Sequence, residues 1–136
     1  MSRLVVLDAA ALLDLLVARD FGFIVEPRVS DARLHVCAHV EAAVLSGLRR
    51  LERDGVLGSS ACEAHLATLC AAPLERHPVS DVLERAWRRR HATWLVDVLS
   101  FELAISLAAT LVTTDPRMAE AAGEIVEFVQ IGGNEE

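Results

Sequence analysis

Two short strand patterns that each lead into an acidic residue constrain the fold of this chain more than any other feature. Residues 4–7 form a continuous apolar run that ends at Asp8, and residues 110–113 (TLVT) form a second short strand pattern, followed by Asp115. Apolar runs of this kind are typical of parallel strands that are buried on both faces. Helical patterns separate the strands, so we expect an α/β fold: a small parallel sheet flanked by helices in three layers, α/β/α.

The rest of the chain alternates between helical and extended patterns. The expected helices cover residues 9–18, 38–53, 95–109, a segment from Ser59 or Ser60 to 70, a segment from Ser80 to about 90, and a short segment from Pro116. Further strands are expected over residues 33–37 and 125–131, with a loop or short helix over residues 19–30. Residues 74–77 fit neither pattern clearly.

The amino-acid composition limits the classes of protein to which the chain can belong. The chain has 136 residues, 53% of them hydrophobic, which suits one domain with a full core over residues 1–131 and a flexible tail over residues 132–136. No apolar run reaches the roughly 18 uncharged residues of a membrane span. The first residues lead straight into a strand pattern rather than a signal peptide, and the three cysteines are widely spaced. We therefore expect a cytoplasmic protein with reduced, buried thiols and no membrane partner.

Three acidic residues are predicted to meet at one edge of the sheet. Asp8 and Asp115 follow the two strands, and sites in such sheets lie beyond the carboxyl ends of the strands. Asp97 opens a helix of about 13 residues, roughly 20 Å long, that must run back antiparallel to the following strand. This course returns Asp97 to the edge where Asp115 lies. The alternative is that each aspartate only caps a helix N-terminus.

Carboxylates gathered at one place repel one another and raise one another's pKa values. A Mg²⁺ or Mn²⁺ ion removes that conflict, because hard cations take oxygen ligands and also bind substrate phosphates. Water activated by such an ion can attack a phosphodiester. The net charge of −7 argues against non-specific wrapping of nucleic acid but is compatible with an enzyme of this kind. Thr113 lies two residues before Asp115 on the same side of the strand, so its hydroxyl is expected to support the site.

Four motifs run through the chain in order: VVLDAAALLD at residues 5–14, LSGLRRL at 45–51, PLERHP at 73–78 and LVTTDPRMA at 111–119. With these motifs the chain resembles PIN-domain proteins, specifically the VapC-type toxins of bacterial toxin–antitoxin pairs. The interval from Asp97 to Asp115 also matches the spacing between the third and fourth acids of the family. The resemblance extends over nearly the whole chain.

The resemblance implies a PIN-like fold and a Mg²⁺- or Mn²⁺-dependent endoribonuclease that acts as the toxin of a type II toxin–antitoxin pair. Such a protein would cut RNA, form a homodimer and be neutralised by a cognate antitoxin protein. Metal-binding and catalytic roles carry over to Asp8, Asp97 and Asp115. Thr113 matches the threonine that precedes the last acid of the family.

The sequence also departs from the family pattern. The serine expected two residues after the first acid is Ala10, and the tyrosines expected around the third acid are Val96 and Ser100. Alignment on residues 48–51 puts the helical glutamate of the family at Ala43. The nearest acid, Glu41, is about 200° away around a helix and serves as the fourth catalytic acid only if the register differs by two residues. The alternative function is therefore a degenerate PIN-fold protein that binds RNA or an antitoxin with weak or no nuclease activity.

Basic residues supply candidate RNA contacts: Arg49, Arg88 and Arg89. The alternative for each is a solvated helix end, where arginine favours the C-terminal dipole. The histidines at 39, 65, 77 and 91 show no ligand spacing with one another. The helical segments at residues 10–17 and 40–51 are candidates for contact with a second copy or an antitoxin.

Overall fold

The computed structural model describes residues 3–19, 32–122 and 128–130, in which strands alternate with helices. The strands are β1 (Arg3–Leu7), β2 (Ala32–Cys37), β3 (Leu74–His77), β4 (Thr110–Thr113) and β5 (Phe128–Gln130). The helices are α1 (Ala9–Arg19), α2 (His39–Arg53), α3 (Ser59–Ala71), the 3₁₀ turn η2 (Val79–Asp81), α4 (Leu83–Arg88), α5 (Leu95–Leu107) and α6 (Pro116–Ala122).

The five strands form one parallel sheet in the order β3-β2-β1-β4-β5. Strand β1 pairs with β2 on one side and with β4 on the other, so that Val5 lies opposite both Leu34 and Thr110. Helices cover both faces of this central strand, and Val5, Val6 and Leu7 have no exposed surface. Burial on both faces explains why the sequence of β1 is apolar at successive positions.

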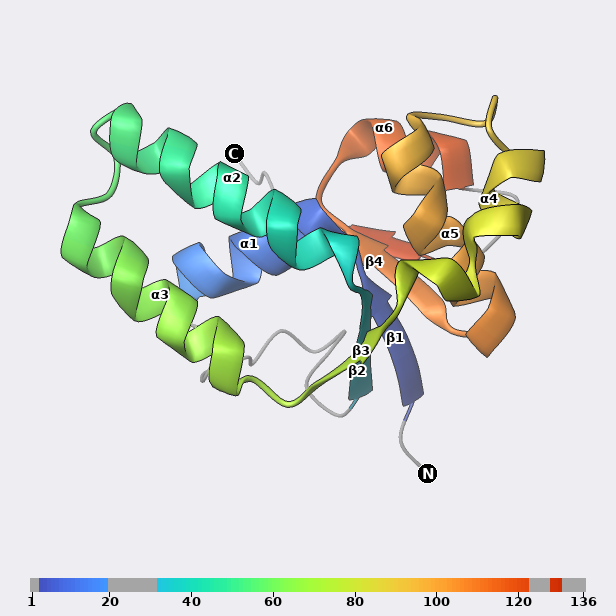
Figure 1. Ribbon diagram of the computed structural model, residues 1–136, viewed down its shortest axis with the longest axis horizontal. Coiled ribbons are helices and arrows are strands. Elements are labelled where there is room, and N and C mark those ends of the chain that lie inside the picture. Colours follow the sequence, from blue (N-terminus) through green and yellow to red (C-terminus); the bar gives the residue numbers. More distant parts are fainter. Residues whose placement is uncertain (1–2, 20–31, 123–127, 131–136) are drawn as a thin grey trace.

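Side chains of the strands alternate between two cores that lie on opposite faces of the sheet. Val5 and Leu7 pack in the core formed with α1, α2 and α3, whereas Val6 packs in the core formed with α4, α5 and α6. Figure 1 shows these two groups of helices on either side of the strands. The three-layer α/β/α fold expected from the sequence is confirmed.

Several expected elements differ in detail. Residues 74–77 form the edge strand β3. The prediction of a single helix from Ser80 to about residue 90 is wrong. The backbone leaves the helical region at Val82 (φ −125°, ψ 3°), which separates the 3₁₀ turn from the shorter helix α4. Helix α3 begins at Ser59 without a serine cap, because Gly58 occupies the N-cap position. Residues 20–30 of the expected loop, residues 125–127 and 131 of the last strand and the tail at 132–136 lie outside the described residues.

Two expectations drawn from composition can be compared with the structure. Cys37 and Cys62 are buried free thiols, as expected, but Cys70 is exposed on α3. Among the helices of the described part of the chain, none is long and apolar enough to cross a membrane.

The end of α5 determines how the chain enters β4. Ala108 adopts a left-handed conformation (φ 53°, ψ 44°), and its N–H bonds to the carbonyls of Ala104 and Ile105. The N–H of Ala109 also bonds to the carbonyl of Ala104, at 2.9 Å. This tight end reverses the chain, so α5 runs antiparallel to β4 and its first turn lies toward the carboxyl end of the sheet.

We expect Ala108→Gly to raise the free energy of unfolding by about 0.5–1 kcal/mol, because glycine adopts a positive φ without the steric cost that alanine bears. Ala109→Gly is the matched control and should lower the free energy, since Ala109 is buried and has no positive φ. Urea denaturation measures both variants. Equal destabilisation by the two substitutions would contradict a strained end of α5.

Candidate functional site

A cleft of about 460 Å³ opens where β1 and β4 end, and three aspartates line it. Asp8 directly follows β1, Asp115 lies two residues after β4, and Asp97 belongs to the first turn of α5. The antiparallel course of α5 brings Asp97 to this edge of the sheet. The other lining residues come from α1, α2 and α6: Ala9, Ala10, Leu13, Ala43, Ser46, Gly47, Arg50 and Arg117.

The carboxylate of Asp8 is only 4% exposed. Its Oδ1 accepts a hydrogen bond from the Ala11 N–H (2.9 Å), and its Oδ2 accepts one from the Thr113 hydroxyl. Burial nevertheless raises the pKa of Asp8 from 3.8 to about 6, against the lowering by these two bonds and with smaller contributions from the charges of Asp97 and Asp115. Desolvation therefore outweighs the local hydrogen bonding.

Thr113 connects two of the three acids. Its buried hydroxyl donates to Asp8, and the oxygen accepts a hydrogen bond from the backbone N–H of Asp115 at 2.9 Å. A hydroxyl has one proton to donate and can accept at the same time, so both bonds are satisfied together. Thr113 thus fixes Asp8 relative to the segment that carries Asp115.

Asp115 has a different electrostatic environment. Its Oδ1 accepts from the Arg117 N–H at 3.0 Å, and its Oδ2 lies 3.1 Å from the Nη2 of the same guanidinium. The hydrogen bond from the Arg117 side chain is the largest cause of a lowered pKa at Asp115. Asp8 and Asp115 each bond an N–H in the first turn of a helix, so they cap α1 and α6 and line the cleft as well.

Asp97 is affected both by burial, as Asp8 is, and by the charge of Arg117, as Asp115 is. Burial raises its pKa, the negative charge of Asp115 raises it further, and the charge of Arg117 lowers it. The positive charge of Arg117 is therefore already shared between Asp115 and Asp97. The cleft brings together three carboxylates with two arginines, Arg50 and Arg117.

The donor set of the cleft suits a hard divalent cation. The three aspartates offer oxygen ligands, and no histidine or cysteine is among the described residues that line the cleft. The oxygens of the three carboxylates do not all lie within 4.8 Å of one another. Mg²⁺ usually keeps several waters and takes one or two carboxylates directly, so a Mg²⁺ site does not need all three oxygens in direct contact with the ion. The raised pKa values of Asp8 and Asp97 mean that their ionised forms are destabilised in the cleft, and a bound cation would stabilise those forms.

Glu41 and Ala43 lie in different surroundings on α2. Ala43 lines the cleft, whereas Glu41 accepts a hydrogen bond from the Nε of Arg76 on β3 at 2.9 Å and is not among the lining residues. Two residues along a helix point in widely different directions, so Glu41 cannot replace an acid at position 43 while α2 keeps this register. Among the residues that the structure describes, the cleft is therefore lined by three acids, and α2 contributes none.

None of the three arginines suggested from the sequence lines this cleft. Arg49 is exposed and lines a separate groove between α2 and α3, and Arg88 is exposed on α4. Arg89 bonds to the carboxylate of Glu102, which is buried on α5. Arg89 therefore compensates an internal charge, a role that its position in a basic run did not indicate.

Sequence reasoning missed two residues of the cleft, Arg50 and Arg117. Arg50 follows Ala43 by seven residues, which is nearly two helical turns, so the spacing could have placed both on one face. Arg117 follows Asp115 by two residues. Its guanidinium also lies 5.7 Å from the ring centre of Trp94, and that side chain is 65% exposed. Trp94 therefore faces solvent beside the cleft.

A parallel sheet between helices, with an acidic cleft at the carboxyl ends of its strands, is typical of a broad class of α/β proteins. Comparison with known proteins identifies the family within that class. The PIN domain family model matches residues 5–124. "Ribonuclease VapC3" of Mycobacterium tuberculosis is 41% identical over 118 residues, which is 86% of each chain. "Ribonuclease VapC12" of the same organism is 25% identical over 125 residues, covering 92% of this chain and 97% of the relative. The chain therefore belongs to the PIN domain family, in its VapC-type branch.

A solved structure supports the same fold. The crystal structure of PAE2754 from Pyrobaculum aerophilum matches with a TM-score of 0.66 and 20% sequence identity, covering 93% of this chain and 83% of that one. At this level of identity the likeness concerns the fold alone.

The raised pKa of Asp8 predicts a specific dependence of stability on pH. The folded form holds the proton more tightly than the unfolded chain, so the contribution to stability is fully present below about pH 4 and is lost as pH rises through about 6. Without divalent ions, the free energy of unfolding of the wild type should fall relative to Asp8→Asn by about 2–3 kcal/mol between pH 4 and pH 7.5. Urea denaturation in EDTA measures this difference.

Asp54→Asn makes the same chemical change at an exposed position after α2 and serves as the control. Its difference from the wild type should stay nearly constant over the same pH range. A flat difference for Asp8→Asn as well would contradict a buried carboxylate with a raised pKa.

Proposed function

We propose that this protein is a Mg²⁺- or Mn²⁺-dependent endoribonuclease that acts in the cytoplasm as the toxin of a type II toxin–antitoxin pair. The observation that carries the proposal is the meeting of Asp8, Asp97 and Asp115 in one cleft, although they lie far apart in the sequence. Its VapC relatives are named as ribonucleases. The most economical account of the acidic cleft is a related activity.

In this proposal Asp8, Asp97 and Asp115 hold the cation. A bound Mg²⁺ would supply a Lewis acid that activates water and offsets the charge of a phosphodiester. Thr113 keeps the Asp8 carboxylate in a fixed orientation through its hydroxyl. Arg117 keeps Asp115 ionised, because the lowered pKa of that carboxyl maintains its negative charge.

The arginines of the cleft also bear on substrate binding. Arg50 lies on the wall formed by α2, where a guanidinium can donate to phosphate oxygens in a bidentate manner. The exposed ring of Trp94, next to Arg117, offers a surface on which an unpaired base can stack. Arg49, Arg88 and Arg89 lie outside the cleft or are engaged elsewhere, so we assign the phosphate contact to Arg50.

A second candidate function rests on a specific observation. Ala43 occupies the wall where the family resemblance leads one to expect a glutamate, and Glu41 is engaged with Arg76. A cleft with one acid fewer can bind a cation and RNA and still cut slowly. The alternative is therefore a PIN-fold protein that binds RNA or an antitoxin with weak or no nuclease activity.

Exposed apolar side chains suggest where partners bind. Apart from Trp94, four of them lie on α4 and at the start of α5: Leu83, Trp87, Leu95 and Val96. We assign this surface to a second copy of the chain in a homodimer. Leu45, which is 54% exposed, borders the groove between α2 and α3, and we assign that groove to an antitoxin segment.

The main prediction concerns RNA cleavage with Mg²⁺ or Mn²⁺. The wild type should cut single-stranded RNA, and Asp97→Asn should slow the reaction by about 100-fold or more, the scale of losing one catalytic group. Ala43→Glu should tighten divalent binding and speed cleavage, because it adds a carboxylate to the wall of the cleft. Glu41→Gln is the control and should change neither property.

Calorimetric titration with Mn²⁺ separates the two candidate functions. Metal binding without cleavage by the wild type, with cleavage gained in Ala43→Glu, supports the second candidate. Absence of both metal binding and cleavage, or cleavage that survives Asp97→Asn, contradicts the proposed site.

A second prediction concerns the phosphate contact. In an Asp97→Asn background that prevents cleavage, Arg50→Ala should weaken binding of a short single-stranded RNA by about 10-fold, as expected for one charged hydrogen bond. It should also reduce the salt dependence of binding. Arg49→Ala, one residue earlier on α2 and outside the cleft, is the matched control. Equal losses in both variants would contradict a contact specific to the cleft.

A further inference from the structure

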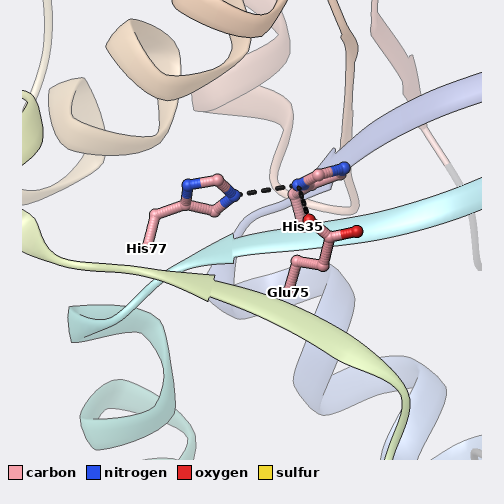
Figure 2. Close-up of side chains that lie close together, drawn as sticks. All are labelled: His35, Glu75 and His77. Atoms are coloured by element: carbon pink, nitrogen blue, oxygen red, sulfur yellow. Dashed lines mark hydrogen bonds and ion pairs between the residues drawn. The ribbon is translucent and has the colours of Figure 1, made fainter.

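Three potential metal ligands from two neighbouring strands meet on the sheet face that carries α4 and α5. His35 of β2 lies opposite Glu75 of β3 in the parallel register, and His77 follows two residues later on the same side of β3. Figure 2 shows the side chains of Glu75 and His77 turned toward the ring of His35. None of the three lines the acidic cleft.

The distances between these side chains are those of a compact ligand set. The Nδ1 of His35 lies 2.8 Å from the Nε2 of His77 and 3.7 Å from the Oε1 of Glu75, and the three ligand atoms all lie within 4.8 Å of one another. Donors bound to one Zn²⁺ at about 2.1 Å in a tetrahedral arrangement lie about 3.4 Å apart. The distance from His35 to His77 is shorter than this value, and the distance from His35 to Glu75 is slightly longer. Small side-chain rotations would therefore bring the three donors into position around one ion.

The surroundings keep these donors oriented and available. His35 is only 4% exposed, so its ring has a fixed position, and burial lowers its pKa and thus favours the neutral imidazole that binds metals. Arg33 bonds to Oε2 of Glu75, which leaves Oε1 directed toward His35. The backbone N–H of Ala38 bonds to the carbonyl of His77 at 2.8 Å and anchors the end of β3.

We propose that His35, Glu75 and His77 form a second metal site, selective for Zn²⁺ or a similar divalent transition metal. Two imidazole nitrogens and one carboxylate oxygen are a ligand set that suits Zn²⁺, with a fourth position for water. Glu75 is 48% exposed, so an ion from solvent can reach this ligand set. Imidazole ligands favour Zn²⁺ over Mg²⁺, whereas the all-oxygen cleft favours Mg²⁺. The bound ion joins the edge strand β3 to β2.

The test uses the full-length protein without an affinity tag, stripped with EDTA and returned to buffer that contains Mg²⁺ to occupy the acidic cleft. Calorimetric titration with ZnCl₂ should show one equivalent bound, and the thermal midpoint should rise with Zn²⁺. His77→Gln and Glu75→Gln should each weaken Zn²⁺ binding 10-fold or more. His91→Gln, at an exposed histidine beyond α4, is the control and should leave the affinity unchanged.

Nuclear magnetic resonance of the histidine rings provides a readout that needs no variant. One equivalent of Zn²⁺ should shift the ring nitrogen signals of His35 and His77 and leave those of His91 in place. Failure of these signals to respond, or a Zn²⁺ affinity unchanged by both substitutions, overturns the proposal. Neither readout depends on RNA cleavage, so the second site and the proposed nuclease function can fail separately.

Discussion

Burial of the Asp8 carboxylate at the end of the central strand is the constraint on which the rest of the site depends. Strand β1 is apolar and covered on both faces, so the residue that ends it enters a region with little water. A carboxylate in such a place must be hydrogen-bonded. Thr113 from β4 and the Ala11 N–H from α1 supply those bonds, and both come from elements that pack against β1. The core of the fold and the geometry of the site therefore share the same contacts.

The same constraint gives the three acids different properties. Asp8 and Asp97 have raised pKa values because they are buried and repel neighbouring carboxylates, whereas Arg117 lowers the pKa of Asp115. Among the described lining residues, Arg117 and Arg50 are two positive charges against three carboxylates. Of the two, only Arg117 affects the pKa values of Asp97 and Asp115. Negative charge that is costly to bury remains there, and a divalent cation is the simplest ligand that would relieve it. The site thus costs the metal-free protein stability at neutral pH.

Much of the fold could be predicted from the sequence, because its signals are local. Apolar strands, helices between them and acids at strand ends predict a parallel sheet with an acidic edge. Strand β3 gives no clear sequence signal, since an edge strand of sequence LERH is mostly exposed and lacks the apolar pattern of β1. No glycine or proline lies between Val79 and Arg88 to mark the break at Val82.

The missed residues are those whose roles depend on long-range packing. Arg88 and Arg89 look alike in the sequence because both are basic. Only the packing of α5 shows that Arg89 bonds to the buried carboxylate of Glu102. Arg49 and Arg50 are adjacent and equally basic in the sequence, and only the packing of α2 shows that Arg50 lines the cleft whereas Arg49 lines the groove beside α3. His35 and His77 lie 42 positions apart, so only the pairing of β2 with β3 reveals that they meet.

The central claim is that the cleft holds uncompensated carboxylate charge that binds a divalent cation. The most direct test is a pH titration of the Asp8 side-chain carboxyl by carbon nuclear magnetic resonance, with and without Mg²⁺. The account predicts a pKa of about 6 in EDTA and a clear fall when Mg²⁺ is added. A pKa near the ordinary value of 3.8 that does not respond to Mg²⁺ would contradict it.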